Sequence, residues 1–190
     1  IIRSRNLYVC GMGESRVDEV LGDLTSGANP TLAPYCKSGE TRLRISARAQ
    51  SEAEAAEMIA SLEARVRETE VGEHIYFASD GIESGAYESC AYAAFRALAD
   101  SGRTVAFAES ITGGLCAKMI SDIPGASAVL RGSAVTYATD TKTSVLGVNA
   151  ETVEKYGVVS EQTAAEMARG ARERFGSDIA VSTTGIADSS

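Results

Sequence analysis

The stretch TVAFAESITGG, residues 104–114, leads from a short apolar run through a serine and a threonine to a pair of glycines. The run TVAFA predicts a buried strand, and Leu115, Met119 and Ile120 after the glycines have the spacing of a helix. The stretch therefore predicts a strand-to-helix turn. In α/β domains, binding and catalytic sites gather at such carboxyl ends of strands.

Ser110 allows three interpretations in this turn. Free amides at the start of a helix can bind a phosphate or a developing oxyanion, and Gly113 and Gly114 would leave those amides unobstructed. Alternatively, Ser110 or Thr112 is only the N-cap of the helix, which spacing alone favours. A phosphate loop is a poor match, because neither GxxxxGK[ST] nor GxGxxG is present.

Strand and helix patterns alternate from residue 79 to residue 190. Strands are predicted at 104–108, 128–137 and 178–184, and helices at 86–100, 141–146, 150–156, after the glycine pair and after an N-cap at Ser160. Gly132, inside the second strand, indicates a bulge or a close backbone approach. This order predicts an α/β domain over residues 79–190.

Two further motifs, VTYATDTK at 135–142 and TTGI at 183–186, follow strands of this domain. Tyr137 and Lys142 can project over one pocket, where a lysine of lowered pKa can replace histidine as the base toward a serine and a tyrosine hydroxyl can relay the proton. Exposed lysines near helix starts are also common. The hydroxyls and the glycine of TTGI can contact a ligand at the same edge, or the motif is an ordinary strand-to-loop turn. The residues alone leave both roles open.

Residues 1–78 predict a small mixed α+β domain. Strands are predicted at 5–10 and 41–49, and a helix at 14–24; the second strand alternates apolar residues with arginines. Ser51 and Glu54 form a capping box before a helix with one apolar stripe, made by Ala55, Ile59, Leu62 and Val66. This βαββα unit resembles KH-like domains but has no GxxG loop for nucleic acid. ASDGIESG, at 78–85, predicts the junction.

Composition limits the classes of function. The chain has 190 residues, 44% of them hydrophobic and 23% charged, with no apolar run near the roughly 18 residues that a membrane span needs. The net charge of −8 argues against nucleic-acid binding, and four scattered cysteines without a CxxC pair indicate reduced thiols in a cytoplasm. His74 is the only histidine, which excludes a multi-histidine metal site. A start at Ile1 without a leader indicates a segment of a longer polypeptide.

Several motifs in order resemble the CinA family. AES-x-TGG at 108–114, VTY followed by Lys142, LGV at 146–148, GVVSE at 157–161 and TTGIA at 183–187 are similar to its C-terminal domain. LYVCGMGES and NPTLAPY, before residue 79, are similar to the KH-like middle domain of its longer members. The resemblance implies an α/β fold in which a three-layer α/β/α domain with a mixed sheet, residues 79–190, follows a small α+β KH-like domain, residues 1–78.

The resemblance also implies an activity, the deamidation of nicotinamide mononucleotide to nicotinate mononucleotide and ammonia. Ser110 matches the family's nucleophile, and Tyr137 and Lys142 match the residues that activate it. The matches to the substrate pocket are Thr112, Gly113, Gly114 and Thr184. No metal or organic cofactor is implied. We expect amides near Gly113 and Gly114 to hold the oxyanion, and helix amides or Arg131 to hold the phosphate.

Two expectations qualify this interpretation. Family members continue TGIA into a Gly- and Pro-rich loop where this chain has GIADSS, so we expect a domain that is either truncated or has a divergent tail. An unpaired strand edge there would favour a homo-oligomer. The alternative function is a non-catalytic nucleotide- or phosphate-binding module in which AESITGG only cradles an anion.

Overall fold

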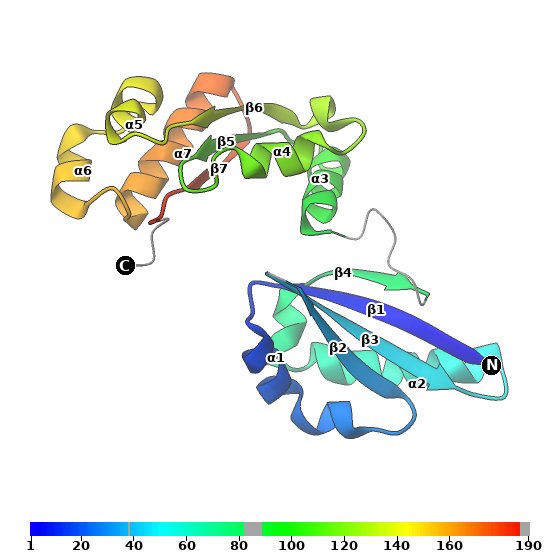
Figure 1. Cartoon of the computed structure of the whole chain (residues 1–190). Coiled ribbons are helices and arrows are strands. Elements are labelled where there is room, and N and C mark those ends of the chain that lie inside the picture. Colours follow the sequence, from blue (N-terminus) through cyan, green and yellow to red (C-terminus); the bar gives the residue numbers. More distant parts are fainter. Residues whose placement is uncertain (38, 82–88, 187–190) are drawn as a thin grey trace. The chain divides into compact units, whose positions relative to one another are not determined.

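The computed structural model describes residues 1–37, 39–81 and 89–186, and the chain divides into two compact units, Ile1–Ala93 and Ala94–Ser190 (Figure 1). Each unit is described by itself. The sequence placed the boundary after residue 78, but strand β4 (Ile75–Asp80) runs beyond that point and pairs with the first strand. Residues 82–85 of the predicted junction lie outside the described residues.

The first unit has a four-stranded antiparallel sheet in the order β2-β3-β1-β4. Its elements are β1 (Ile2–Cys10), α1 (Glu14–Leu21), η1 (Gly22–Ser26), β2 (Thr31–Lys37), β3 (Glu40–Arg48), α2 (Glu52–Arg67), η2 (Glu70–His74) and β4. β2 and β4 have no counterpart among the predicted ranges. β2 contains Pro34, which has no amide proton and argues against a strand in the sequence. The structure places β2 at the edge of the sheet, where a missing amide destabilises least.

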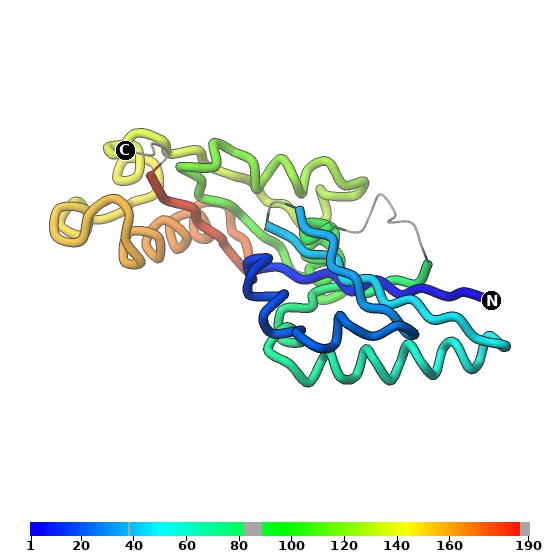
Figure 2. The backbone as a smooth tube through the Cα atoms, turned by 60° about the horizontal axis from the view of Figure 1, so that its bottom comes forward, coloured from blue at the N-terminus to red at the C-terminus, as the bar shows by residue number. Residues whose placement is uncertain are grey.

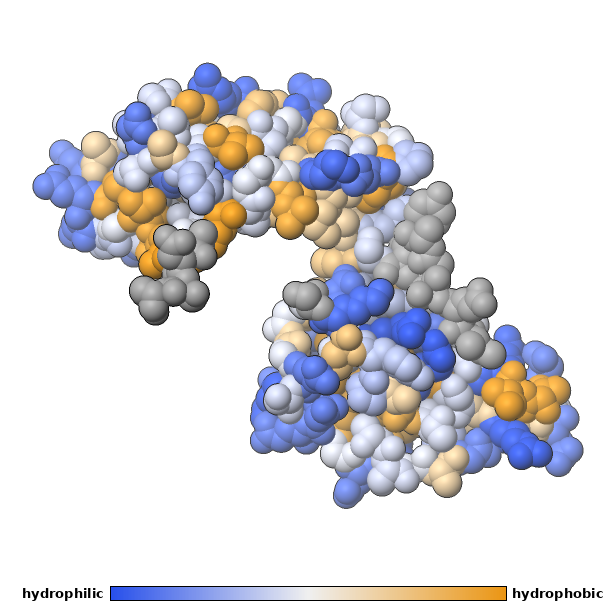
Figure 3. Space-filling view, in the orientation of Figure 1, coloured by the Kyte–Doolittle hydropathy of each residue, from blue (hydrophilic) through white to orange (hydrophobic). Residues whose placement is uncertain are grey.

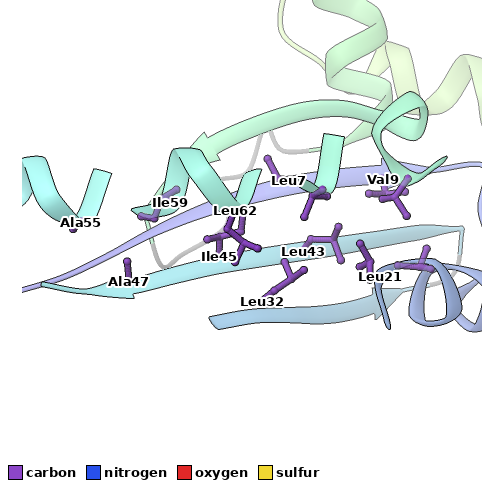
Figure 4. Packing of buried hydrophobic residues seen from close by; sticks show 13 residues of the cluster. Leu7, Val9, Leu21, Leu32, Leu43, Ile45, Ala47, Ala55, Ile59 and Leu62 are labelled. Carbon is purple, nitrogen blue, oxygen red and sulfur yellow. The ribbon is translucent and has the colours of Figure 1, made fainter. Parts of the chain in front are cut away.

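One face of this sheet packs with α1, α2 and η2 to form the core of the first unit (Figure 4). Along β3 the apolar side chains of Leu43, Ile45 and Ala47 are buried in alternation with partly exposed residues, as the sequence predicts. The buried residues of α2 are the predicted stripe, Ala55, Ile59, Leu62 and Val66. The α+β prediction for this unit is therefore confirmed.

The start of α2 supplies a first prediction. Ser51 Oγ accepts a hydrogen bond of 3.2 Å from the amide of Glu54, as expected for an N-cap. Replacing Ser51→Ala should weaken the helix by about 1 kcal/mol, because one amide loses its acceptor. Hydrogen-exchange mass spectrometry should then show about five-fold faster exchange in α2. Ser61→Ala, at an exposed position of the same helix, is the control; equal exchange in both variants would contradict the cap's contribution.

The second unit is an α/β domain with a sheet in the order β6-β5-β7. Its elements are α3 (Cys90–Asp100), which begins in the first unit, β5 (Val105–Glu109), α4 (Leu115–Ser121), η3 (Ala126–Ala128), β6 (Leu130–Val135), α5 (Thr139–Leu146), α6 (Ala150–Tyr156), α7 (Glu161–Phe175) and β7 (Ile179–Thr183). The resemblance implies a mixed sheet in this unit, and the three strands of the described residues are all parallel.

β5 is the central strand, and helices cover both of its faces. Ala108 packs with Met167 and Ala171 of α7, while Glu109, the next residue, faces α4 through hydrogen bonds to the amides of Cys116 and Ala117. In Figure 2 the orange α7 and the green α4 lie on either side of the strands. These contacts make three layers, in which the sheet lies between α7 on one face and α4 on the other. The carboxyl ends of β5, β6 and β7 meet at one edge of the sheet.

Gly132 in β6 permits the close approach that the sequence predicted. A Cβ at this position would lie 2.7 Å from the ring of Phe175, at the end of α7, and the register of β5 and β6 shifts beside it. No helix among the described residues is long and apolar enough to cross a membrane.

Candidate active site

Ser110 lies directly after β5, where three strand ends meet. Its amide donates to the carbonyl of Thr183 at the end of β7, at 3.0 Å, and on the other side Thr136 donates to the carbonyl of Glu109 at 2.8 Å. The side chain of Ser110 is 6% exposed. The parallel sheet thus brings together the ends of all three predicted motifs.

Lys142 is fully buried on α5, and its ammonium group reaches Ser110. The Nζ atom lies 3.1 Å from Ser110 Oγ, 2.7 Å from the carbonyl oxygen of Thr136 and 3.3 Å from that of Tyr137. No carboxylate pairs with it among the described residues. Burial lowers the pKa of Lys142, because a charged amine is costly in an apolar surrounding.

These three oxygen partners suit both protonation states of Lys142. A neutral amine has two N–H groups, which fit the two carbonyls, and one lone pair, which can accept the hydroxyl proton of Ser110. A charged amine donates to all three oxygens. The proton can therefore move from Ser110 to Lys142 without leaving a buried group unpaired, which is the behaviour required of a general base.

Tyr137 contributes to this site through its backbone. Its carbonyl accepts from Lys142, while its side chain is 64% exposed and its hydroxyl makes no hydrogen bond to a described residue. The sequence left open whether Lys142 takes the proton of Ser110 directly or through a relay by this hydroxyl. In the structure Lys142 contacts Ser110 directly, without the relay.

Glu109 is a site residue that the sequence reasoning missed. It is fully buried, and its carboxylate accepts five hydrogen bonds, from the amides of Gly114, Cys116 and Ala117 and the hydroxyls of Thr112 and Ser133. Burial alone would raise the pKa of Glu109, but these hydrogen bonds outweigh it and the pKa is lowered. The carboxylate, and neither Ser110 nor Thr112, caps the start of α4.

The amides of the glycine pair are consequently occupied. The amide of Gly113 donates to the carbonyl of Ser110 at 3.0 Å, and that of Gly114 donates to the carboxylate of Glu109 at 3.1 Å. The sequence predicted that amides near these glycines hold the oxyanion, but these two already have acceptors. Both glycines have positive φ angles, 60° and 105°, which explains their presence. Within the described chain, the amides of Ile111 and Thr112 are the donors in this loop that lack an acceptor.

Of the two threonines in TTGI, Thr183 reaches the serine loop. Its hydroxyl lies 2.7 Å from that of Thr112 and 3.4 Å from the amide of Ser110. Thr184, which the resemblance matches to the substrate pocket, donates to the carbonyl of Val158 at 2.9 Å. A hollow of about 570 Å³ opens beside the loop, lined by residues that include Ile111, Thr112, Ser160, Thr183 and Thr184.

Two other residues lie away from this site. Arg131 is at the opposite end of β6, where it donates to the carbonyl of Phe175 at 3.4 Å, so the structure does not support it as a phosphate ligand. His74 belongs to the first unit and bonds the carbonyl of Cys10. The described residues contain no group of three or more His, Cys, Asp or Glu side chains suited to a metal ion.

The fold and the site define a small α+β unit joined to an α/β unit with a buried serine–lysine pair at its strand ends. The CinA C-terminal domain model matches residues 87–190, and the model of the damage-inducible protein CinA KH domain matches residues 4–76. The chain belongs to the CinA family, and its two units correspond to these two domains.

Individual relatives agree with this membership. The chain is 44% identical to a "putative competence-damage inducible protein" of Caldanaerobacter subterraneus, over 98% of this chain and 43% of the relative, and 44% identical to one of Moorella thermoacetica with the same coverage. It therefore spans less than half the length of these relatives. A crystal structure of the competence/damage inducible protein CihA from Agrobacterium tumefaciens is 42% identical, with a TM-score of 0.52, over 57% of this chain and 66% of that one.

Proposed function

We propose that the second unit is a serine amidohydrolase that deamidates nicotinamide mononucleotide. The observation that supports it most directly is the contact of 3.1 Å between the buried Lys142 Nζ and Ser110 Oγ, together with the lowered pKa of that lysine. A serine and a neutral lysine are sufficient for nucleophilic attack on a carboxamide. The substrate itself comes from the resemblance of the motifs to the CinA family.

The reaction proceeds in two halves. Lys142 takes the proton of Ser110, Oγ attacks the carboxamide carbon, and the amides of Ile111 and Thr112 stabilise the oxyanion. The protonated Lys142 then gives its proton to the leaving nitrogen, and ammonia departs. In the second half Lys142 takes a proton from water, the hydroxide attacks the acyl carbon, and Ser110 regains its proton as nicotinate mononucleotide leaves. The hollow beside Thr112 and Thr184 receives the rest of the substrate.

The alternative, a non-catalytic phosphate-binding module, is less well supported. The carboxylate of Glu109 already occupies the amides of Gly114, Cys116 and Ala117 at the start of α4, which leaves only the amides of Ile111 and Thr112 in the described loop for an anion. A second negative charge there would also be repelled by this buried carboxylate.

Ammonia release from nicotinamide mononucleotide tests the proposal. We expect the chain to form ammonia and nicotinate mononucleotide in equal amounts, and Ser110→Ala to abolish both. A fluorophosphonate probe, which reacts with activated serines, should label Ser110 in the wild-type chain, and peptide mass spectrometry locates the label. Binding of the nucleotide without ammonia release, equal in both proteins, would instead establish the binding module.

The proposal includes association of two copies through the second unit. Large apolar side chains are exposed there, among them Leu115, Met119, Val135 and Val181, and Figure 3 shows such side chains at its surface in orange. Within the described residues β6 and β7 each pair only with β5, so the outer edges of both strands are open. Light scattering should give twice the mass of one chain; a monomer at all concentrations would contradict association.

A further inference from the structure

The buried carboxylate of Glu109 ties the serine loop and the start of α4 to the neighbouring strand β6. Its Oε2 atom accepts from Thr112 Oγ1 at 2.7 Å, Gly114 at 3.1 Å and Cys116 at 2.9 Å. Its Oε1 atom accepts from Ala117 at 2.9 Å and from Ser133 Oγ, in β6, at 3.2 Å. One side chain thus holds the loop after Ser110 at Thr112 and Gly114, together with the first turn of α4.

The charge of Glu109 also fixes the direction of a chain of hydroxyls. An ionised carboxylate only accepts, so Thr112 donates its hydroxyl proton to Glu109. The oxygen of Thr112 must then accept the proton of Thr183, 2.7 Å away. The oxygen of Thr183 is left with its lone pairs toward the amide of Ser110, at 3.4 Å. The carboxylate of Glu109 therefore fixes the directions in which the hydroxyls of Thr112 and Thr183 donate, and so leaves Thr183 as an acceptor for the amide of Ser110.

We infer that Glu109 is a positioning residue that holds the loop so that Ser110 meets Lys142 while the amides of Ile111 and Thr112 stay free for the oxyanion. This inference rests on the proposed function. Glu109 touches neither Ser110 Oγ nor Lys142 in the structure, so it acts through the loop. Its loss should lower the rate of attack by Ser110 and leave the strength of substrate binding unchanged.

The test compares Glu109→Gln with Glu166→Gln in the full chain. Glu166 is a matched carboxylate on α7 that accepts one amide, of Asn149, and one hydroxyl, of Thr152, both at 2.7 Å and away from the serine loop. We expect Glu109→Gln to slow fluorophosphonate labelling of Ser110 and kcat by about 10-fold to 100-fold, with KM within about two-fold. The pH midpoint of labelling should not move. Glu166→Gln should label at the wild-type rate.

A threonine pair keeps the inference testable if Glu109→Gln does not fold. Thr183→Val breaks the hydroxyl chain and should slow labelling, whereas Thr183→Ser keeps the hydroxyl and should restore it. Wild-type labelling by a folded Glu109→Gln protein, or by Thr183→Val, would overturn the positioning role. Failure of the wild-type chain itself to label, as with Ser110→Ala, would instead refute the proposed nucleophile, so the two failures are distinguishable.

Discussion

Lys142→Met should lower ammonia release by about 10³-fold while the second unit remains folded. Methionine has a similar length and fills the same buried space, but it cannot take the proton of Ser110. Lys118→Met is the control, because Lys118 is 66% exposed on α4 and pairs with Asp122. Its turnover should equal that of the wild type. Turnover of Lys142→Met near the wild-type rate would show that another group is the base.

The pH dependence of Lys142 gives this prediction a second measurement. Since burial lowers the pKa of Lys142, its neutral form appears below the ordinary value of 10.5, and turnover should rise with pH to a plateau whose midpoint lies below that value. In this same window Lys142 binds one more proton in the unfolded chain than in the folded chain, so its contribution to the free energy of unfolding should also rise with pH. Both rises should be absent in Lys142→Met.

The meeting of Ser110 with Lys142 was predictable because it depends on topology alone. Alternating strands and helices place strand ends at one edge, and both residues follow strand ends. The sequence left the role of the lysine open because burial decides it. A lysine near a helix start is exposed in most proteins, and only the packing of α5 shows that this one is enclosed.

The details that the sequence missed depend on single-residue geometry. Adjacent residues of a strand point to opposite faces, so the choice between Thr183 and Thr184 needs the exact register of β7 with β5. Predicting the role of Glu109 requires knowing which amides at the start of α4 lie within hydrogen-bond distance of its carboxylate. The exposed side chain of Tyr137 likewise follows from tertiary contacts that no local pattern encodes.

The position of Lys142 depends on a close backbone contact between α5 and α7. A Cβ at Gly170, in α7, would lie 1.9 Å from the carbonyl oxygen of Leu146. Leu146 is the last residue of α5, about one helical turn after Lys142. Any side chain at position 170 must therefore push away the helix that carries the proposed base.

Gly170→Ala should consequently destabilise the second unit by about 2–3 kcal/mol, although the same change in an unobstructed helix stabilises it by about 1 kcal/mol. Turnover should fall by about 10²-fold, because a shift of about 1 Å separates the base from its serine. Thermal unfolding and ammonia release measure the two effects.

Ala165→Gly separates loss of stability from displacement of the base. It lies at an exposed position of the same helix, so it should cost about 1 kcal/mol through helix propensity and leave turnover unchanged. If Gly170→Ala lost stability but kept full turnover, α5 would hold Lys142 independently of α7. If it lost neither, the close contact would not determine the position of α5. Loss of both, with Ala165→Gly active, would show that a glycine outside the site sets the distance between the base and its nucleophile.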